Sequence, residues 1–297
     1  MTILLPVTLD GIPIRLYSQR MTCALHSTML TPSVMTFGKG AATYKAYLDS
    51  PHGRLRCDIL WHQLGIFMVK AWGAEPPRLD VLDVGCGTGE VALRLAASGH
   101  AVTLLDPVEE MHQLARENAQ ALAPPPAFPP RFIAGTLEEA AGLLPNTTFD
   151  LVLCHTLLEY LPAPFSALPL LSALLSPGGC LSVVVLNRSQ EPLRLAIRDG
   201  KLDEARKALA NPGIADSLFG LPRAAMTFEA LRSELEAAGI QAVGHAGIFV
   251  AADYLEPCDL KEPSHFNALL RLEVEAGARS PFTDIARYLH LWGRRTG

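Results

Sequence analysis

Residues 81–90, with the sequence VLDVGCGTGE, decide the fold class of this chain. The stretch begins as a short apolar run, which is typical of a buried parallel strand. It continues into a loop in which Gly85, Gly87 and Gly89 alternate with other residues, and a helical segment, EVALRLAAS, follows. Because glycine has no Cβ atom, such a loop can turn tightly and let a ligand approach, and the helix N-terminus can receive an anionic group.

An acidic residue ends the next predicted strand. The segment AVTLLD closes on Asp106, whose carboxylate can accept hydrogen bonds from both hydroxyl groups of a ribose. A dinucleotide-binding fingerprint requires a third glycine at position 90, but the residue there is Glu90, and Asp83 is also foreign to that fingerprint. A glycine loop with an acid at the end of the next strand therefore indicates another ligand that contains a nucleoside.

Strand and helix patterns alternate outward from this loop. Further strands are expected at 131–135, 149–155 and 178–187, with helical segments between them. This alternation predicts an α/β fold, a doubly wound Rossmann-like sheet covered by helices on both faces. Two C-terminal strands, at 240–254 and 286–293, are expected to complete seven strands as an antiparallel edge.

Helix boundaries follow from the same patterns. Residues 41–72 are expected to be helical, and Pro107 stands where the first residue of a helix is expected, ahead of Glu109 and Glu110 in the positive first turn. Residues 1–36 have no sustained period, which predicts a poorly ordered N-terminal extension before a single domain at 37–297.

A polar helical insertion is expected at 188–226. Its charged residues are mixed, with seven basic against five acidic side chains, so a solvated face and an RNA-binding face both remain open. The basic residues are Arg188, Arg194, Arg198, Lys201, Arg206, Lys207 and Arg223.

Composition excludes several classes of protein. The chain has 297 residues, of which 49% are hydrophobic, and a net charge of -5, which excludes a disordered chain and a small disulfide-stapled module. A negative net charge does not indicate nucleic-acid binding. Six scattered cysteines form no C-x-x-C pair, so no metal site is expected. With no signal-peptide pattern and no apolar run of ~18 residues, we expect a cytoplasmic protein without a membrane span.

Residues 81–187 resemble the class I S-adenosylmethionine-dependent methyltransferases. The resemblance rests on the glycine loop, Asp106, the segment FDLVLCHTLLEYL and the turn LLSPGG. It implies an enzyme with S-adenosyl-L-methionine as its cofactor, whose amino-acid part contacts residues 85–87. It also implies that Asp106 holds the ribose and that residues 135–137 flank the adenine.

A narrower resemblance covers roughly residues 41–297. The segments GRLRCDILW and CHTLLEYL, together with the C-terminal tail, are similar to the bacterial tRNA wobble-uridine methyltransferases that esterify 5-carboxymethoxyuridine. This resemblance implies cofactor contacts by Arg56 and His155. Cys86 and Thr88 depart from that subgroup's glycine loop, and the insertion lacks its lysine run. The cofactor-binding residues that both resemblances imply are Arg56, Asp83, Gly85, Cys86, Gly87, Gly89, Asp106, Thr136, Leu137 and His155.

The acceptor follows less directly from the sequence. Transfer of a methyl group from a sulfonium is an in-line displacement, and a carboxylate acceptor is already ionised at neutral pH, so no general base is required. We therefore assign no catalytic residue and take Arg188, Arg223 and Glu159 as candidates for positioning the acceptor. Three interpretations remain: a tRNA-modifying enzyme, a methyltransferase of small molecules, and a cofactor-binding partner protein without catalysis. The intact glycine loop with Asp106 argues against the third, and the oligomeric state stays open.

Overall fold

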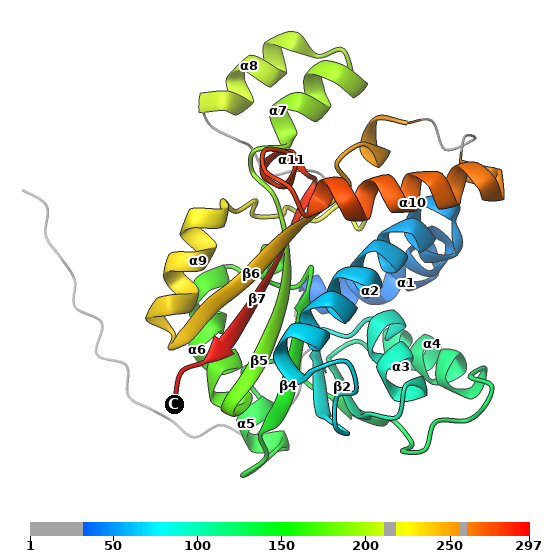
Figure 1. Cartoon of the computed structure of the whole chain (residues 1–297), viewed down its shortest axis with the longest axis vertical. Helices are drawn as coiled ribbons and strands as arrows, with labels where there is room; N and C mark the ends of the chain where they lie inside the picture. Colours follow the sequence, from blue (N-terminus) through cyan, green and yellow to red (C-terminus); the bar gives the residue numbers. More distant parts are fainter. Residues whose placement is uncertain (1–31, 211–217, 256–259) are drawn as a thin grey trace, which may run out of the picture. The chain divides into compact units, whose positions relative to one another are not determined.

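The computed structural model describes residues 32–210, 218–255 and 260–297. They form one seven-stranded sheet in the order β3-β2-β1-β4-β5-β7-β6, which Figure 1 shows at the centre of the domain. The strands are β1 (Asp80–Val84), β2 (Ala101–Asp106), β3 (Arg131–Ala134), β4 (Phe149–His155), β5 (Leu175–Leu186), β6 (Ile240–Ile248) and β7 (Tyr288–Arg295).

The predicted doubly wound α/β sheet is confirmed. Strands β1 to β5 pair in parallel, while β7 lies antiparallel between β5 and β6. The central strands are nearly continuous apolar runs because both of their faces are buried. The chain runs from β1 outward to β3 and returns to β4 on the other side of β1, so the order of the strands reverses between β1 and β4.

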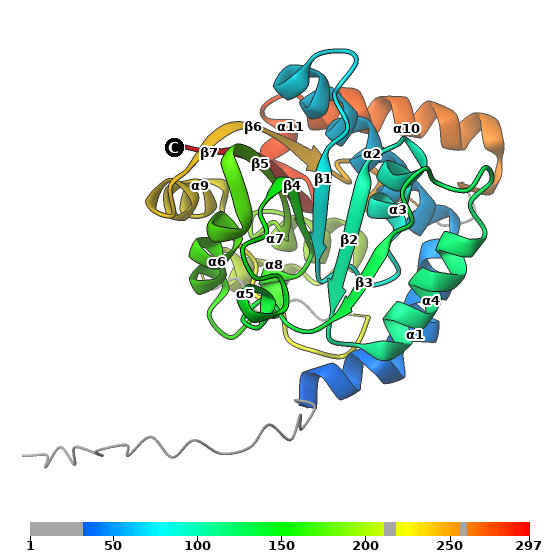
Figure 2. The same ribbon diagram turned by 90° about the horizontal axis from the view of Figure 1, so that it is seen from below.

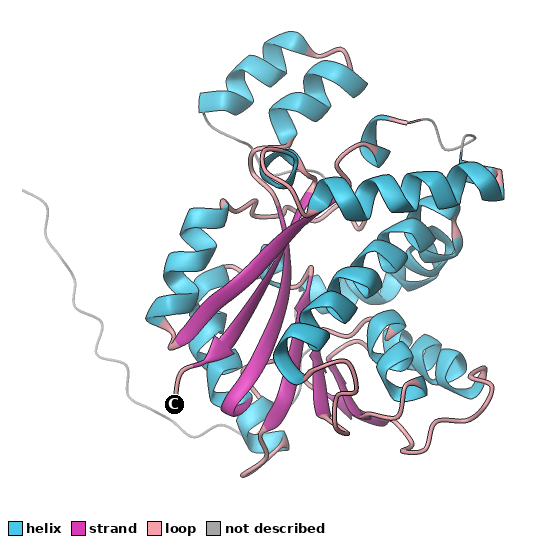
Figure 3. Cartoon of the chain, in the orientation of Figure 1, coloured by secondary structure: helices cyan, strands magenta, loops and turns pink. Residues whose placement is uncertain are grey.

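Helices cover both faces of the sheet, as Figures 2 and 3 show. One core cluster joins the strands to α2 (Pro51–Trp72), α3 (Glu90–Ala97) and α10 (Pro263–Gly277). A second cluster joins the other face to α5 (Ala140–Leu143), α6 (Ala167–Leu174) and α9 (Phe228–Ala237). The remaining helices are α1 (Pro32–Asp49), α4 (Glu109–Gln120), α7 (Glu191–Leu193), α8 (Leu202–Ala210) and α11 (Phe282–Ile285).

The N-terminal helices differ from the sequence-based expectation. The helix predicted over 41–72 is two helices, because the Ser50 hydroxyl accepts a hydrogen bond from the Gly53 backbone N–H at 3.1 Å and caps α2. Helix α1 begins at Pro32, so residues 32–36 are helical rather than poorly ordered. The rest of the predicted extension, residues 1–31, lies outside the described residues.

The start of α4 is a second correction. The helix begins at Glu109 with Val108 as its N-cap residue, so Pro107 precedes the cap instead of occupying the first helical position. Glu109 and Glu110 lie in the first turn as expected. The carboxylate of Asp106 accepts from the Val108 backbone N–H at 2.9 Å, which places the cap at Val108 and Pro107 outside the helix.

The insertion forms a small helical arm beyond the end of β5 (Figure 1). It contains α7, a π-helical turn (Arg194–Arg198) and α8, which pack together through Leu195, Ala205 and Ala208. Residues 211–217 of the predicted insertion lie outside the described residues. None of the helices in the described ranges is long and apolar enough to cross a membrane.

Candidate functional site

A cavity lined by residues of the glycine loop opens at the carboxyl ends of β1, β2 and β4. Its volume is about 870 Å³, and it lies where the strand order reverses between β1 and β4. In open α/β sheets this crevice is the usual ligand site, because adjacent loops leave the sheet in opposite directions there. The volume falls within the range of about 300–1,000 Å³ that pockets for small ligands and cofactors have.

The glycine loop forms the floor of the cavity. Gly85, Gly87 and Gly89 have φ angles of 67°, 53° and 74°, a region that residues with a Cβ atom rarely adopt. A Cβ atom at Gly85 would lie 3.0 Å from Leu157 Cδ1, and one at Gly89 would lie 2.7 Å from Leu104 Cδ2. Gly85 and Gly87 line the cavity, whereas Gly89 lies behind it and lets the loop pack on the sheet.

Asp106 is held rigidly at the edge of the cavity. Its Oδ2 accepts a hydrogen bond from the Gly87 backbone N–H and its Oδ1 accepts one from Val108, each at 2.9 Å. A carboxylate oxygen has two lone pairs, so each oxygen can still accept from a ligand. Burial raises the pKa of Asp106 to about 6, although the two backbone donors oppose the shift. Burial and the charge of Asp106 raise the pKa of Asp83 to about 7.

Helices α1 and α2 place Arg56 beside the glycine loop. Arg56 Nη2 donates a hydrogen bond to the Tyr44 hydroxyl at 3.1 Å, and its guanidinium lies 5.4 Å from the centroid of the Tyr47 ring. Tyr44 also lies against Gly87, since a Cβ atom there would be 3.5 Å from its ring. Both tyrosines line the cavity, and the sequence analysis missed them. Their spacing could have indicated them, because aromatic residues three positions apart lie on the same face of a helix.

His155 is the last residue of β4 and lines the cavity. Its Nε2 lies 2.9 Å from the Ser182 hydroxyl oxygen in the neighbouring strand β5. Burial, assisted by the positive charge of Arg56, lowers the pKa of His155 to about 3. The imidazole is therefore neutral at physiological pH and can serve a ligand as a hydrogen-bonding group but not as a charge.

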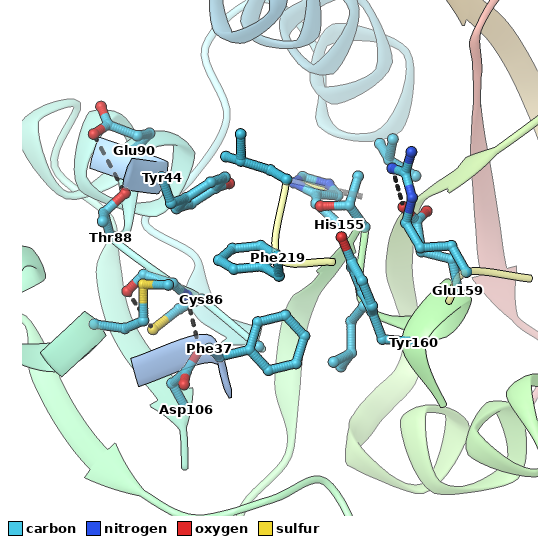
Figure 4. A pocket seen from close by; sticks show the side chains of 18 of the residues that line it. Phe37, Tyr44, Cys86, Thr88, Glu90, Asp106, His155, Glu159, Tyr160 and Phe219 are labelled. Carbon is cyan, nitrogen blue, oxygen red and sulfur yellow. Dashed lines mark hydrogen bonds and ion pairs between the residues drawn. The ribbon is translucent and has the colours of Figure 1, made fainter. Parts of the chain in front are cut away.

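Four aromatic side chains gather across the cavity from distant parts of the chain (Figure 4). Phe37 makes edge contacts with Tyr160 and Phe219, with ring centroids 5.0 and 4.7 Å apart, and Tyr44 lies 5.6 Å from Phe219. These residues come from α1, from the turn after β4 and from the end of the insertion. No local sequence pattern indicates that they meet, because their proximity depends on the fold alone.

Glu159 and Arg223 form a buried ion pair in the wall of the cavity. Arg223 Nη1 lies 3.1 Å from Glu159 Oε1, and Glu159 Oε2 accepts from the Leu186 backbone N–H at 2.9 Å. Burial raises the pKa of Glu159, and the charge of Arg223 opposes the rise. The structure brings these two predicted positioning residues together. Arg188, the third candidate, is exposed and is not among the cavity-lining residues.

Asp253 connects the insertion to the sheet on the same side of the cavity. Its Oδ2 accepts hydrogen bonds from Arg287 Nη1 at 2.6 Å and from Gln190 Nε2 at 2.9 Å. Its Oδ1 lies 3.7 Å from Arg198 Nη1. Arg287 precedes Tyr288, which begins β7, and both line the cavity. Arg287 and Tyr288 belong to the C-terminal tail that resembles the tRNA methyltransferases, but no pattern in its sequence predicts a role for either residue.

The other predicted cofactor residues lie in the same cavity. Cys86 contributes to the glycine loop, and Thr136 and Leu137 line the wall beside β3. The described residues contain no group of three histidine, cysteine or acidic side chains that is placed to hold a metal ion. Cys57, Cys86, Cys154 and Cys180 are free thiols.

Comparisons with known proteins agree on one activity. Residues 81–179 match the family described as Methyltransferase domain. The chain is 30% identical to the tRNA 5-carboxymethoxyuridine methyltransferase of Escherichia coli (strain K12) over 82% of its own length and 89% of the relative's. It is 36% identical to the ubiquinone biosynthesis O-methyltransferase of Vibrio parahaemolyticus over 39% of this chain and 48% of that one.

A solved structure shares the fold. Magnesium protoporphyrin IX methyltransferase from Synechocystis PCC 6803, crystallised with bound SAH, superposes with a TM-score of 0.59. The match covers 89% of this chain and 98% of the other, at 16% sequence identity.

Proposed function

Because the chain belongs to the S-adenosylmethionine-dependent methyltransferases, we propose that it esterifies the carboxyl group of 5-carboxymethoxyuridine in tRNA. The cofactor supplies an electrophilic methyl group on a sulfonium, and a carboxylate oxygen of the acceptor receives it. Similarity to the Escherichia coli enzyme over 82% of this chain and 89% of the relative supports this acceptor, and the arginines around Tyr288 support it independently.

The residues at the glycine loop fit the cofactor. Gly85 and Gly87 leave room for a ligand to approach the backbone, and the fixed carboxylate of Asp106 has lone pairs for two ribose hydroxyls. Arg56 offers a guanidinium, oriented by Tyr44, for the carboxylate of the amino-acid part. Thr136 and Leu137 would border the adenine on the wall beside β3.

One observation carries the assignment of the acceptor: guanidinium groups converge on Tyr288, which lines the cavity. The Arg287 and Arg56 guanidiniums lie 5.7 and 5.9 Å from the centroid of its ring. Burial alone would raise the pKa of Tyr288, but the charges of Arg287, Arg56 and Arg223 outweigh burial and lower it. A neutral hydroxyl whose pKa is lowered in this way reports a positive potential at the cavity wall.

The group of arginines near Tyr288 favours an anionic acceptor. With Arg56 assigned to the cofactor, the cavity-lining arginines Arg198, Arg223 and Arg287 remain. Within the described ranges they are paired with only two acids, Glu159 and Asp253, so this group sums to a positive charge. A guanidinium has five N–H donors, so Arg223 and Arg287 can keep their acidic partners and still donate to the carboxylate of an acceptor.

The chemistry requires positioning and no proton transfer. A carboxylate with an ordinary pKa of about 4 is ionised at neutral pH, so its oxygen is nucleophilic without a base. Arg223 and Arg287 would hold the carboxylate, and the aromatic group of Phe37, Tyr44, Tyr160 and Phe219 offers ring faces to the uracil. Fixing the approach of the two reactants can contribute ~7–11 kcal/mol to lowering the barrier.

A methyl-transfer assay tests the proposal. Purified enzyme is incubated with S-adenosylmethionine that carries a labelled methyl group and with tRNA bearing 5-carboxymethoxyuridine. We expect label in the tRNA, and we expect mild alkali to release it because esters hydrolyse readily. Conversion of Arg223 to Lys should raise KM for tRNA, because a lysine cannot grip a carboxylate through two parallel hydrogen bonds.

The free nucleoside and a surface variant are the controls. The nucleoside should be a far poorer acceptor, since contacts to the rest of the tRNA help to orient the carboxylate. Arg232→Lys, which changes an exposed residue of α9, should leave both acceptors unaffected. Label that resists alkali, or equal turnover of the free nucleoside, would favour methylation of a small molecule instead. A tRNA acceptor would also place the enzyme in the cytoplasm.

A further inference from the structure

A chain of buried polar side chains crosses one face of the sheet from β4 to α2. His155 Nε2 lies 2.9 Å from Ser182 Oγ, which lies 2.8 Å from His290 Nε2. Trp292 Nε1 donates a hydrogen bond to the same His290 Nε2 at 2.8 Å. His290 Nδ1 lies 2.9 Å from Gln63 Oε1. Ser182 and His290 are fully buried, so water does not share these contacts.

The positions of the protons in this series of hydrogen bonds follow from Trp292, which lies at one end of the series. An indole N–H can only donate, so His290 Nε2 carries no proton and accepts. A neutral imidazole has one N–H, which must then be on His290 Nδ1 and point to Gln63 Oε1. The amide of Gln63 agrees with this direction, because its Nε2 donates to the Gly247 carbonyl at 2.7 Å and leaves Oε1 toward His290.

The hydroxyl group of Ser182 determines the direction of the next hydrogen bond, the one to His155. Since His290 Nε2 carries no proton, the Ser182 hydroxyl is a second donor that shares the lone pair of this nitrogen with Trp292, because otherwise two lone pairs would face each other at 2.8 Å. The Ser182 oxygen is then an acceptor toward His155, so His155 Nε2 carries a proton. Burial lowers the pKa values of both His155 and His290, so neither imidazole is charged.

The second nitrogen of His155 is left as a bare acceptor. A neutral imidazole with its proton on Nε2 has a lone pair on Nδ1, and His155 lines the cavity opposite Cys86 and Asp106 in Figure 4. Within the described part of the chain, no side chain or backbone group donates to Nδ1. Arg56 lies close enough for its charge to lower the pKa of His155.

A guanidinium beside a neutral acceptor matches a zwitterion. A guanidinium binds a carboxylate, whereas a bare imidazole nitrogen accepts from an ammonium group. The amino-acid part of S-adenosylmethionine carries both groups on one carbon atom. Arg56 and His155 therefore offer complementary partners to the two groups, and a proton on Nδ1 would turn the acceptor into a repelling donor.

We propose that Gln63, Trp292, His290 and Ser182 lock His155 in the tautomer with its proton on Nε2, so that Nδ1 accepts a hydrogen bond from the α-ammonium group of the cofactor. Ser182 and His290 are then positioning residues that act through His155. The inference depends on the cofactor, which membership of the family establishes, and not on the identity of the acceptor.

Nuclear magnetic resonance tests the lock without any variant having to remain active. In full-length protein labelled with ¹⁵N in histidine, couplings between ring protons and nitrogens distinguish the two tautomers. The His155→Asn variant identifies the signals of His155. We expect the Nε2–H pattern in the wild-type protein and a mixture of tautomers in Ser182→Ala. An Nδ1–H pattern in the wild-type protein would overturn the proposal.

Calorimetry tests the role of Nδ1. The probes are S-adenosylhomocysteine and its analogue that lacks the α-amino group. We expect the wild-type protein to prefer the amino compound and Ser182→Ala to lose about tenfold of that preference, as expected for one hydrogen bond to a charged group. Ser182→Thr, which keeps a hydroxyl, should restore most of the preference. Equal preference in the wild-type protein and Ser182→Ala would contradict the assignment.

A double variant separates the lock from a general loss of packing. The side-chain oxygen of asparagine can replace Nδ1 as an acceptor and has no tautomers to lock. Adding Ser182→Ala to His155→Asn should therefore cost no further preference for the amino compound. A further loss as large as in the wild-type background would mean that Ser182 acts on the site by packing and not through His155.

Discussion

Arg223 and Glu159 form an ion pair in which Nη1 and Oε1 lie 3.1 Å apart while the two side chains are 7% and 0% exposed. Removal of one partner leaves the other as an uncompensated buried charge. Arg223→Ala should therefore lower the free energy of unfolding by ~3–5 kcal/mol in urea denaturation.

An exposed pair supplies the matched control for that variant. Arg232 and Glu236 lie 3.8 Å apart on α9 and are about half exposed. Arg232→Ala should cost at most ~1 kcal/mol, because water screens exposed pairs. Equal losses for Arg223→Ala and Arg232→Ala would mean that the pair in the cavity wall is solvated and not a buried structural element.

Asp106 should determine cofactor affinity. Asp106→Asn keeps the shape of the side chain, but it loses the charge that strengthens two hydrogen bonds to the ribose and replaces one acceptor oxygen with an NH2 donor. Titration calorimetry should show binding of S-adenosylmethionine weakened at least about tenfold. Asp203→Asn, at an exposed acid on α8, is the control and should bind normally. Unchanged affinity in Asp106→Asn would refute the ribose contact.

The stability of the cofactor-free protein should fall as pH rises. The folded protein holds a proton on Asp83 up to a pKa of about 7, whereas an unfolded aspartate releases its proton near pH 3.8. Between these values the folded state binds more protons, so the free energy of unfolding decreases as pH increases. Asp83→Asn, which stays neutral, should lose ~2 kcal/mol less than the wild-type protein between pH 5 and pH 8.

Denaturation curves at several pH values provide this comparison. Asp106 also titrates in this window, with a pKa of about 6, so a residual slope is expected in Asp83→Asn. A slope identical to that of the wild-type protein would show that Asp83 is ionised throughout the range.

The arm of the insertion offers a test of RNA contact. Arg194 is paired with Glu191 and Asp199, and Arg198 with Asp253, so these arginines are already engaged. Two further basic residues of α8, Arg206 and Lys207, are exposed and make no ion pair with any residue that the structure describes. If tRNA lies along the arm, reversing their charges should flatten the dependence of tRNA binding on salt.

The cofactor provides the control for the charge reversal. Arg206→Glu with Lys207→Glu should leave binding of S-adenosylmethionine unchanged, because both residues lie outside the cavity. A salt dependence equal to that of the wild-type protein would mean that tRNA approaches by another surface.

The fold and half of the cavity could be predicted from sequence because their signals are local. The strand, glycine loop and helix at 81–97 are contiguous, and Asp106 ends the next strand, so parallel pairing alone brings them together. The apolar runs also define the strands that are buried on both faces. Boundaries were less accurate, since Ser50 caps a helix inside a periodic stretch and the Val108 cap excludes Pro107.

The part of the cavity proposed to hold the acceptor, around Arg223, Arg287 and Tyr288, could not be predicted from sequence, because these residues meet only through tertiary structure. Arg223 and Arg287 are far apart in sequence, and both of their charges act on Tyr288 only because β7 pairs with β5. Arg188 matched Arg223 in residue type and lies in the same insertion, yet its side chain is exposed. Residue type and approximate position do not determine which arginine reaches a cavity.

Mass spectrometry of tRNA nucleosides tests the central claim most directly. Bulk tRNA is digested from the source organism, from a strain lacking this gene, and from that strain carrying the wild-type gene. We expect the strain without the gene to lose the methyl ester of 5-carboxymethoxyuridine and to accumulate the free acid, and the wild-type gene to restore the ester. An unchanged level of ester in the strain without the gene would contradict the proposed function.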